Sequence, residues 1–191
     1  MTARLSRAAL RDLPPGIRRP GYEPGRVGHG IVHLGIGAFH RAHQAVYTDD
    51  AIEAAGGDWR ILGVSLRSAE VAEALNPQDG LYSLVERGVE GTAARIVGSI
   101  GRIIVSPREP GAALAAMAAP ENRIVSLTVT EKAYGIDRAS GRVLPDHPSI
   151  APDLITPREP QGTLGLLTEA LRRRREAGLA PLTVLCCDNL P

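Results

Sequence analysis

Apolar residues recur along the chain with two spacings, which distinguish predicted strands from predicted helices. In the first part they predict strands over residues 31–34 and 59–66 and helices over residues 39–55 and 69–75. Gly35 and Gly37 lie between the first strand and the first helix, and Gly56 and Gly57 end that helix. A strand, a glycine turn, a helix and a second strand make a βαβ unit, whose strands run parallel with a right-handed crossover.

The second part of the chain continues this alternation. It predicts β-rich runs at residues 81–85 and 96–105, a helix over 110–118, a strand over 124–129, an irregular surface stretch over 135–160, a helix over 162–177 and a strand over 182–187. The run 124–129 is apolar almost throughout, as expected for a strand buried on both faces of a sheet. The last predicted helix has Leu164, Leu167 and Leu171 on one face, and we interpret the arginines at 172–175 as a solvated helix end favoured by the macrodipole.

This order of elements predicts an α/β fold, with a Rossmann-like, doubly wound and mostly parallel sheet and helices on both of its faces. We expect residues 1–28 to form a lead-in segment and residues 29–191 to form the Rossmann domain. Ligand groups in such sheets lie just past the carboxyl ends of the strands. The polar pair Asp188-Asn189 follows the last predicted strand, and the sequence ends two residues later.

Composition and charge narrow the class of protein. With 191 residues, 43% of them hydrophobic, the chain has the size and apolar content of one globular domain. A net charge of +1 gives no overall attraction to nucleic acid or to anionic membranes. No apolar run approaches the roughly 18 residues of a membrane helix, and residues 1–19 lack the apolar block of a signal peptide. Cys186 and Cys187 form no disulfide framework or zinc spacing, so we expect a cytoplasmic protein.

The glycine turn is the first candidate for a binding site. Gly35 permits a tight turn after the strand, and Gly37 lets the backbone approach a pyrophosphate at the positive end of the helix. The third glycine of the usual dinucleotide fingerprint is replaced by His40. On the residues alone the turn therefore fits either a dinucleotide site or an ordinary connection between a strand and a helix.

The end of the second predicted strand should meet the ribose of a bound dinucleotide. Arg67 and Ser68 stand there and are suited to a 2′-phosphate, whereas Glu70, one helical turn further, is suited to a ribose hydroxyl. The residues leave the choice between NAD and NADP open.

Three further groups carry candidate chemistry. His33, His40 and His43 invite a metal site, but no carboxylate or thiol completes a familiar ligand set, so we favour packing or a place near a phosphate and predict no metal. Glu131-Lys132 follows the strand over 124–129, either as a solvated salt pair or as part of a substrate site. Asn189 either closes a turn after the last strand or donates a hydrogen bond to a carbonyl oxygen that gains charge.

At four places the sequence resembles the mannitol dehydrogenase and fructuronate reductase family, the long-chain polyol-specific dehydrogenases. The matching segments, which run in order at fitting spacing from about residue 29 to the end, are Ile31 to Gln44 (IVHLGIGAFHRAHQ), Gln78 to Tyr82 (QDGLY), Ile124 to Lys132 (IVSLTVTEK) and Cys187 to Asn189 (CDN). The histidine in place of the third glycine is normal in that family.

The resemblance implies a metal-independent oxidoreductase that moves hydride between NAD and a polyol, ketose or sugar acid, with NADP as the other cofactor to consider. It implies a second, helical domain that supplies a lysine general base and lies outside this chain, so the chain alone should bind cofactor without turnover. The substrate stays undecided between the mannitol/fructose and the mannonate/fructuronate type. A stand-alone nucleotide-binding module without catalysis is the alternative.

The turn and the resemblance together predict a set of site residues. Asn189 is the predicted catalytic residue, for stabilising an oxyanion. The predicted cofactor-binding residues are Gly35, Ile36, Gly37, Ala38, Phe39, His40, Arg41, Arg67, Ser68, Thr128, Glu131 and Lys132.

Overall fold

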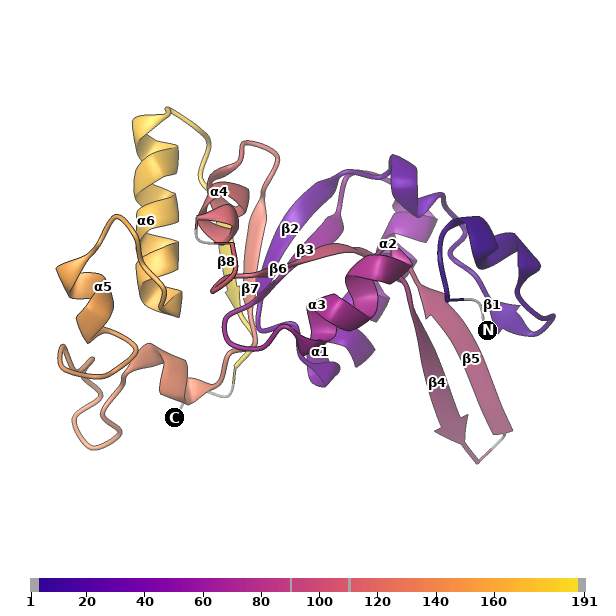
Figure 1. Ribbon diagram of the computed structural model, residues 1–191, viewed down its shortest axis with the longest axis horizontal. Coiled ribbons are helices and arrows are strands. Elements are labelled where there is room, and N and C mark those ends of the chain that lie inside the picture. The colour runs from indigo at the N-terminus through magenta and orange to yellow at the C-terminus, as the bar shows by residue number, and fades with distance from the viewer. Residues whose placement is uncertain (1–3, 90, 110, 189–191) are drawn as a thin grey trace.

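A five-stranded parallel sheet organises the chain. The computed structural model describes residues 4–89, 91–109 and 111–188, and its strands are β1 (Ile17–Arg18), β2 (His29–Leu34), β3 (Arg60–Ser65), β4 (Tyr82–Gly88), β5 (Gly91–Val97), β6 (Ile100–Val105), β7 (Ile124–Leu127) and β8 (Thr183–Cys186). Strands β6, β3, β2, β7 and β8 lie side by side in that order, and every neighbouring pair is parallel (Figure 1). The strand order reverses at β2, so the predicted doubly wound, Rossmann-like α/β fold is confirmed.

Helices cover both faces of this sheet. The α-helices are α1 (Ala38–Ala42), α2 (Gln44–Ala55), α3 (Glu70–Leu75), α4 (Ala112–Ala118), α5 (Ala151–Ile155) and α6 (Thr163–Glu176), and the 3₁₀-helices are η1 (Ala8–Asp12), η2 (Pro24–Arg26), η3 (Asn76–Gln78) and η4 (Glu131–Tyr134). On one face, Leu34 and Leu127 pack with Met117 of α4 and Leu166 of α6. On the other face, Ile61 and Ile103 pack with Ala45 of α2 and Leu75 of α3. Burying one such large side chain contributes about 1.5–3 kcal/mol, so both layers hold the strand order in place.

A smaller sheet of β1, β5 and β4 projects from one end of the molecule as a hairpin with a short third strand (Figure 1). The buried carboxylate of Asp49, on α2, ties the small sheet to the rest of the fold. It accepts hydrogen bonds from Arg95 Nη2 (2.8 Å), the Gly98 N–H (2.9 Å) and the Tyr22 hydroxyl (2.6 Å). Burial and the bond to Asp49 both raise the pKa of Tyr22. Residues 17–22 of the predicted lead-in segment therefore pack against the rest of the chain.

The helix predicted over residues 39–55 is in fact two helices. The chain breaks at His43, whose φ of −127° and ψ of −92° are not helical and whose N–H bonds to the carbonyl of His40. The break changes the buried face: His40, Ala45 and Ile52 point inward, while Phe39 is 65% exposed. The prediction of one continuous helix over residues 39–55 was therefore wrong.

The run predicted over residues 96–105 is also divided. Residues 96–97 end β5 in the small sheet, and β6 begins at Ile100 in the large sheet. Between them, the buried Ser99 donates its hydroxyl to the carbonyl of Ala45 (2.6 Å). This bond holds the crossing between the two sheets against α2, and hydrophobicity alone did not reveal it.

The helix predicted over residues 162–177 is confirmed as α6, but its buried face differs. Leu166, Leu167 and Ala170 are buried, whereas Leu171 is 42% exposed. Arg174 is buried, and its guanidinium donates to the carbonyls of Ala119 (2.5 Å) and Ala180 (2.7 Å). The interpretation of the whole arginine run as a solvated helix end was therefore wrong for Arg174, which fastens the end of α6 to the loop after α4.

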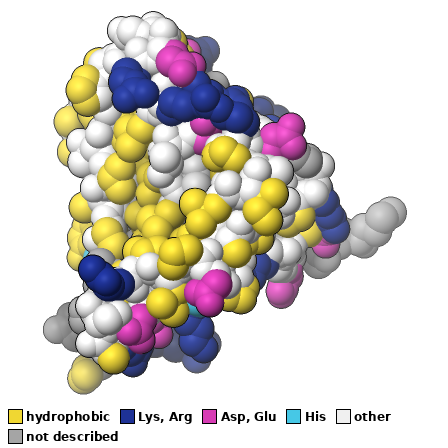
Figure 2. Space-filling view, turned by 90° about the vertical axis from the view of Figure 1, so that its left-hand side faces the viewer, with side chains coloured by type: hydrophobic (Ala, Val, Ile, Leu, Met, Phe, Trp, Pro, Cys, Tyr) yellow, Lys and Arg dark blue, Asp and Glu magenta, His cyan; other side chains and the backbone are white. Residues whose placement is uncertain are grey.

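The stretch over residues 135–160 is irregular as predicted, apart from α5 and an isolated bridge between Ile136 and Val143. On this side of the molecule apolar side chains gather in the middle of the face, with basic side chains above them (Figure 2). The exposed apolar residues of this region are Val143, Leu144, Leu154, Ile155 and Leu171. Within residues 4–89, 91–109 and 111–188, no helix is both long and apolar enough to cross a membrane.

Candidate functional site

The glycine turn after β2 lies at the carboxyl ends of the central strands. Gly35 has a φ of +96°, and a Cβ at this position would collide with the backbone carbonyl of Thr128, which follows β7. The Gly35 N–H bonds to the carbonyl of Val64 at the end of β3 (3.0 Å). Glycine is therefore required here both by the left-handed backbone and by the close approach of the neighbouring chain.

Gly37 is different, because nothing in the fold requires a glycine there. Its φ is −76° and its ψ is −178°, and an added Cβ would meet only the carbonyl oxygen of Gly35, at 3.8 Å. The first bond inside α1 runs from the Arg41 N–H to the Gly37 carbonyl, so the N–H groups of Ala38, Phe39 and His40 precede it. The first two of these residues are exposed, and their amides carry the partial positive charge of a helix start.

Two predicted site residues, Ile36 and Arg41, shape the turn from within. Ile36 is 3% exposed, and its side chain packs so closely over β3 that a Cβ on Gly63 would collide with it. The Arg41 guanidinium donates to the carbonyl of Ile36 (2.7 Å), and the Tyr82 hydroxyl donates to the carbonyl of Arg41 (2.5 Å). Both side chains therefore hold the turn and α1 in place.

His33 and His40 form a stacked pair beneath the turn. Their ring centroids are 3.4 Å apart, with an angle of 16° between the planes, and both rings are buried. His33 Nδ1 lies 2.8 Å from the Ser126 hydroxyl, and His33 Nε2 lies 2.9 Å from the hydroxyl of Thr128, which itself donates to the Gly35 carbonyl. These contacts connect β2, β7 and the glycine turn through one imidazole.

Burial keeps both imidazoles neutral. It lowers the pKa of His33 to about 4 and the pKa of His40 to about 2, with the nearby His33 as the second cause for His40. Within the described part of the chain neither ring nitrogen of His40 makes a hydrogen bond of good geometry, although the nearby Gln44 side chain acts to raise its pKa. His43 does not join the pair; its ring stacks on Phe39 at 5.3 Å between centroids. Residues 4–89, 91–109 and 111–188 contain no group of three or more His, Cys, Asp or Glu side chains arranged to hold a metal ion.

The segment after β7 has a strained backbone. Thr130 has a φ of +77° and a ψ of 153°, a region that residues other than glycine occupy at a cost of about 1–3 kcal/mol. The carboxylate of Asp188 accepts hydrogen bonds from the N–H groups of Val129 (3.1 Å) and Thr130 (2.8 Å) and from the hydroxyl of Tyr134 (2.6 Å). Burial and these contacts raise the pKa of Tyr134. Asp188, which follows β8, thus fixes the path of the chain after β7.

Glu131 and Lys132 lie on this segment but do not pair with each other. The carboxylate of Glu131 forms an ion pair with Arg138 (3.2 Å), and Lys132 is exposed. The solvated pair between the two neighbours, one of the two interpretations of this motif, is therefore wrong. Asn189, the predicted catalytic residue, lies outside the described residues.

Arg67 and Ser68 follow the end of β3, and Arg67 lies beside a hollow. The Ser65 hydroxyl donates to the Ser68 carbonyl (2.5 Å), and the Ser68 hydroxyl accepts the Glu70 N–H at the start of α3 (3.1 Å). The Arg67 side chain is exposed and lines a cavity of about 310 Å³ together with Ala133 of η4. The rest of its lining comes from Leu66 and from residues between 148 and 163, and the glycine turn is not part of it. A neighbouring cavity of about 530 Å³ shares Leu66 and Gln161 with it.

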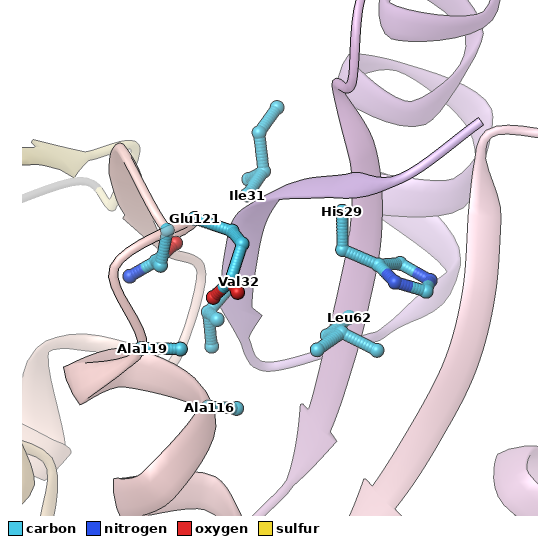
Figure 3. A pocket seen from close by; sticks show the side chains of 8 residues that line it. His29, Ile31, Val32, Leu62, Ala116, Ala119 and Glu121 are labelled. Atoms are coloured by element: carbon cyan, nitrogen blue, oxygen red, sulfur yellow. The ribbon is translucent and has the colours of Figure 1, made fainter.

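Another hollow of about 300 Å³ lies at the opposite edge of the sheet (Figure 3). His29, Ile31 and Leu62 line it from the first halves of β2 and β3, and Ala119 lines it from the chain after α4. It therefore lies at the amino end of the strands, away from the glycine turn, and is not part of the candidate site.

The structure thus brings most of the predicted residues together at one edge. The glycine turn, Arg67, Ser68, Thr128 and the segment after β7 all lie at the carboxyl ends of β2, β3 and β7. Sequence reasoning missed Ser126, Tyr134 and the role of Asp188. An Asp directly after a strand was a signal for the last of these, but it gave no indication of the partners that the carboxylate would find.

Comparison with known proteins identifies a family for these features. Residues 29–191 match the family model described as the mannitol dehydrogenase Rossmann domain. The chain is 45% identical over 189 residues to the uncharacterized oxidoreductase YeiQ of Escherichia coli K12 and 44% identical over 184 residues to the D-mannonate oxidoreductase of the same organism. These matches cover 98% and 94% of this chain but only 39% and 37% of the two relatives.

A solved structure has the same fold. The mannitol 2-dehydrogenase of Pseudomonas fluorescens, in a ternary complex with NAD and D-mannitol, superposes with a TM-score of 0.93 at 40% identity. The match covers 99% of this chain and 39% of that one. The chain therefore spans about two fifths of the length of the proteins that it matches.

Proposed function

The chain belongs to the mannitol dehydrogenase family, and from this premise we propose that it is the cofactor-binding part of an NAD-dependent oxidoreductase. The cofactor is NAD, bound at the carboxyl edge of the five-stranded sheet. The reaction of the whole protein is hydride transfer between the nicotinamide and a polyol, ketose or sugar acid. The chain by itself binds the cofactor without turnover, because it spans only about 39% of such relatives.

The open space beside Gly37 is the observation that carries this proposal. The fold needs glycine at Gly35 but leaves room for a side chain at Gly37, and a bound pyrophosphate would use that room. Ala38 and Phe39, at the start of α1, are exposed residues, and an anion at a helix start gains from the N–H groups there. The position is the point where the strand order reverses, and dinucleotides bind there in doubly wound sheets.

The adenosine end of the cofactor belongs beside Arg67 and Ser68. The cavity of about 310 Å³ that Arg67 lines with Ala133 begins just past the carboxyl end of β3. We propose NAD rather than NADP because the solved relative was crystallised with NAD. The exposed guanidinium of Arg67 makes NADP the competing cofactor, because it could pair with a 2′-phosphate.

The nicotinamide end belongs beside the segment after β7, with Thr128, Glu131 and Lys132 nearby. The cofactor supplies the hydride or receives it, and the chain's own residues position it and exclude water. Asn189, next to Asp188 in the sequence, is our candidate for donating a hydrogen bond to the substrate oxygen as charge develops there. Lys132 is exposed, and we do not assign it as the general base.

The substrate is either a polyol or a sugar acid, since the relatives include both a mannitol 2-dehydrogenase and a D-mannonate oxidoreductase. A polyol is uncharged and a sugar acid carries a carboxylate, so the two need different partners in the substrate pocket. We place the protein in the cytoplasm, with the cofactor and a small carbohydrate as its only partners and no role for nucleic acid or membrane. The exposed thiols of Cys186 and Cys187 suit a reducing compartment.

Fluorescence titration with NADH tests the cofactor site. We expect Gly37→Leu to abolish binding, because the leucine would occupy the room kept for the pyrophosphate. Gly88→Leu is the matched control: an added Cβ at Gly88 meets nothing within 4 Å, and the residue lies at the tip of the β4–β5 hairpin, away from the candidate site.

Wild type and Gly88→Leu should bind NADH with the same affinity, and the melting temperatures of all three proteins should agree. Equal affinity in Gly37→Leu and wild type would overturn the proposed site. Parallel titration with NADPH separates the two cofactors. A protein that binds neither nucleotide would overturn the proposed function itself.

A further inference from the structure

Asp188 connects the end of β8 to the end of β7. Its Oδ1 accepts the N–H of Thr130 at 2.8 Å, and its Oδ2 accepts the N–H of Val129 at 3.1 Å and the hydroxyl of Tyr134 at 2.6 Å. The three donors span one tight turn of chain, which includes η4. One carboxylate therefore holds two successive backbone amides and the side chain that closes the turn.

The two amides are that of the strained residue, Thr130, and that of the residue before it, Val129. Thr130 keeps a φ of +77° although it has a Cβ, and no side chain caps η4 at this residue. A conformation of this kind persists only where the surroundings hold it. The bonds from Asp188 to Val129 and Thr130 supply that hold, and a glycine at position 130 would not need them.

The turn held in this way touches the glycine turn directly. Thr128 donates its hydroxyl to the carbonyl of Gly35 (2.8 Å), and its own carbonyl lies where a Cβ of Gly35 would be. A shift of the chain after β7 would therefore move the wall against which the β2 turn is packed. It would also move Glu131 and Lys132, which follow Thr130 in η4.

We propose that Asp188 is a positioning residue for the cofactor site. Its carboxylate fixes the strained backbone at Thr130, and this backbone holds Thr128 in place against Gly35. The inference rests on the proposed function, because it specifies how that same site is kept in shape. Asp188 acts through the backbone of residues 128–130, with no contact to the cofactor required.

NADH titration of the Asp188→Asn variant tests this role. The asparagine keeps the size of the side chain, but its amide nitrogen cannot accept the bonds that one carboxylate oxygen receives now. We expect the dissociation constant for NADH to rise about tenfold or more, because the backbone beside Gly35 loses its hold. Asp58→Asn is the matched control: Asp58 also accepts one backbone N–H, from Gly28 at 2.7 Å, but at the amino edge of the sheet. Its NADH affinity should stay at the wild-type value.

A second substitution separates positioning from general support of the fold. In the double variant Thr130→Gly/Asp188→Asn, the glycine adopts the required backbone without the carboxylate. We expect NADH affinity to return to within about threefold of wild type, a difference of less than 1 kcal/mol. Failure of this rescue, with the double variant folded but as weak as Asp188→Asn, overturns the proposal. If Asp188→Asn alone does not fold, the double variant should fold and bind, and a double variant that is unfolded also overturns it.

Hydrogen exchange distinguishes failure of this inference from failure of the proposed function. The amide protons of Val129 and Thr130 should exchange slowly in wild type and fast in Asp188→Asn, whether or not NADH binds. If wild type does not bind NADH, but exchange at these amides is faster in Asp188→Asn than in wild type, the cofactor function is refuted and the positioning role of Asp188 stands. If exchange at both amides is the same in Asp188→Asn and wild type, the positioning role is refuted.

Discussion

Replacing His40 by phenylalanine tests the physical account of the buried imidazole pair. The ring of His40 is 1% exposed, stacks on His33 at 3.4 Å between centroids, and leaves both of its nitrogens without a hydrogen bond of good geometry among the described residues. An unpaired buried polar group costs about 1–3 kcal/mol, and an apolar group of similar shape removes that cost. Phenylalanine has a slightly larger ring, which offsets part of the gain. We expect His40→Phe to be at least as stable as wild type at pH 7.

The pH dependence of the free energy of unfolding gives a more specific prediction than the stability at pH 7 alone. Burial lowers the folded-state pKa of His40 from 6.5 to about 2, so the unfolded chain binds a proton below pH 6.5 that the folded chain does not. The stability that the neutral imidazole provides is present above pH 6.5 and is lost as the pH falls toward the folded value. Between pH 6.5 and pH 5 the loss is about 1.5 units at 1.36 kcal/mol each, or about 2 kcal/mol. His33, with its pKa lowered to about 4, adds a similar loss to both proteins.

Urea unfolding at pH 7 and pH 5 measures this difference. From pH 7 to pH 5, wild type should lose about 2 kcal/mol more of its free energy of unfolding than His40→Phe does. Parallel losses in the two proteins would refute the neutral, buried state of His40. A variant that is much less stable than wild type at pH 7 would show that the imidazole nitrogens do have partners, contrary to the geometry.

Two further predictions concern the chemistry of the site. In a polypeptide that extends this chain to the length of its relatives, Asn189→Ala should slow single-turnover hydride transfer by about 10²–10³, with NADH affinity unchanged; a rate within about threefold of wild type would make Asn189 a turn residue. Arg67→Ala should weaken NADPH binding in the chain while leaving NADH affinity within about twofold, because only the 2′-phosphate needs a charged partner; equal losses for both nucleotides in paired titrations would place Arg67 elsewhere on the cofactor.

Local features were sufficient to predict much of the fold and one end of the site. The alternation of strand and helix patterns determined the parallel sheet, because each element buries an apolar face whose period can be counted along the chain. The turn at Gly35 was also predictable, since a left-handed backbone after a strand selects glycine whatever packs against it. The exposed residues at the start of α1 follow from that turn.

Contacts between residues far apart in the chain decided the rest. The break at His43 depends on His40 turning inward to stack on His33, and the burial of Arg174 depends on carbonyls more than 50 residues away. The site shows the same limit. Asp188 lies 58 residues from Thr130, and no periodicity relates a carboxylate after one strand to a strained amide after another. Only the parallel pairing of β7 with β8 brings their carboxyl ends together, so the tertiary structure alone gave Asp188 its partners.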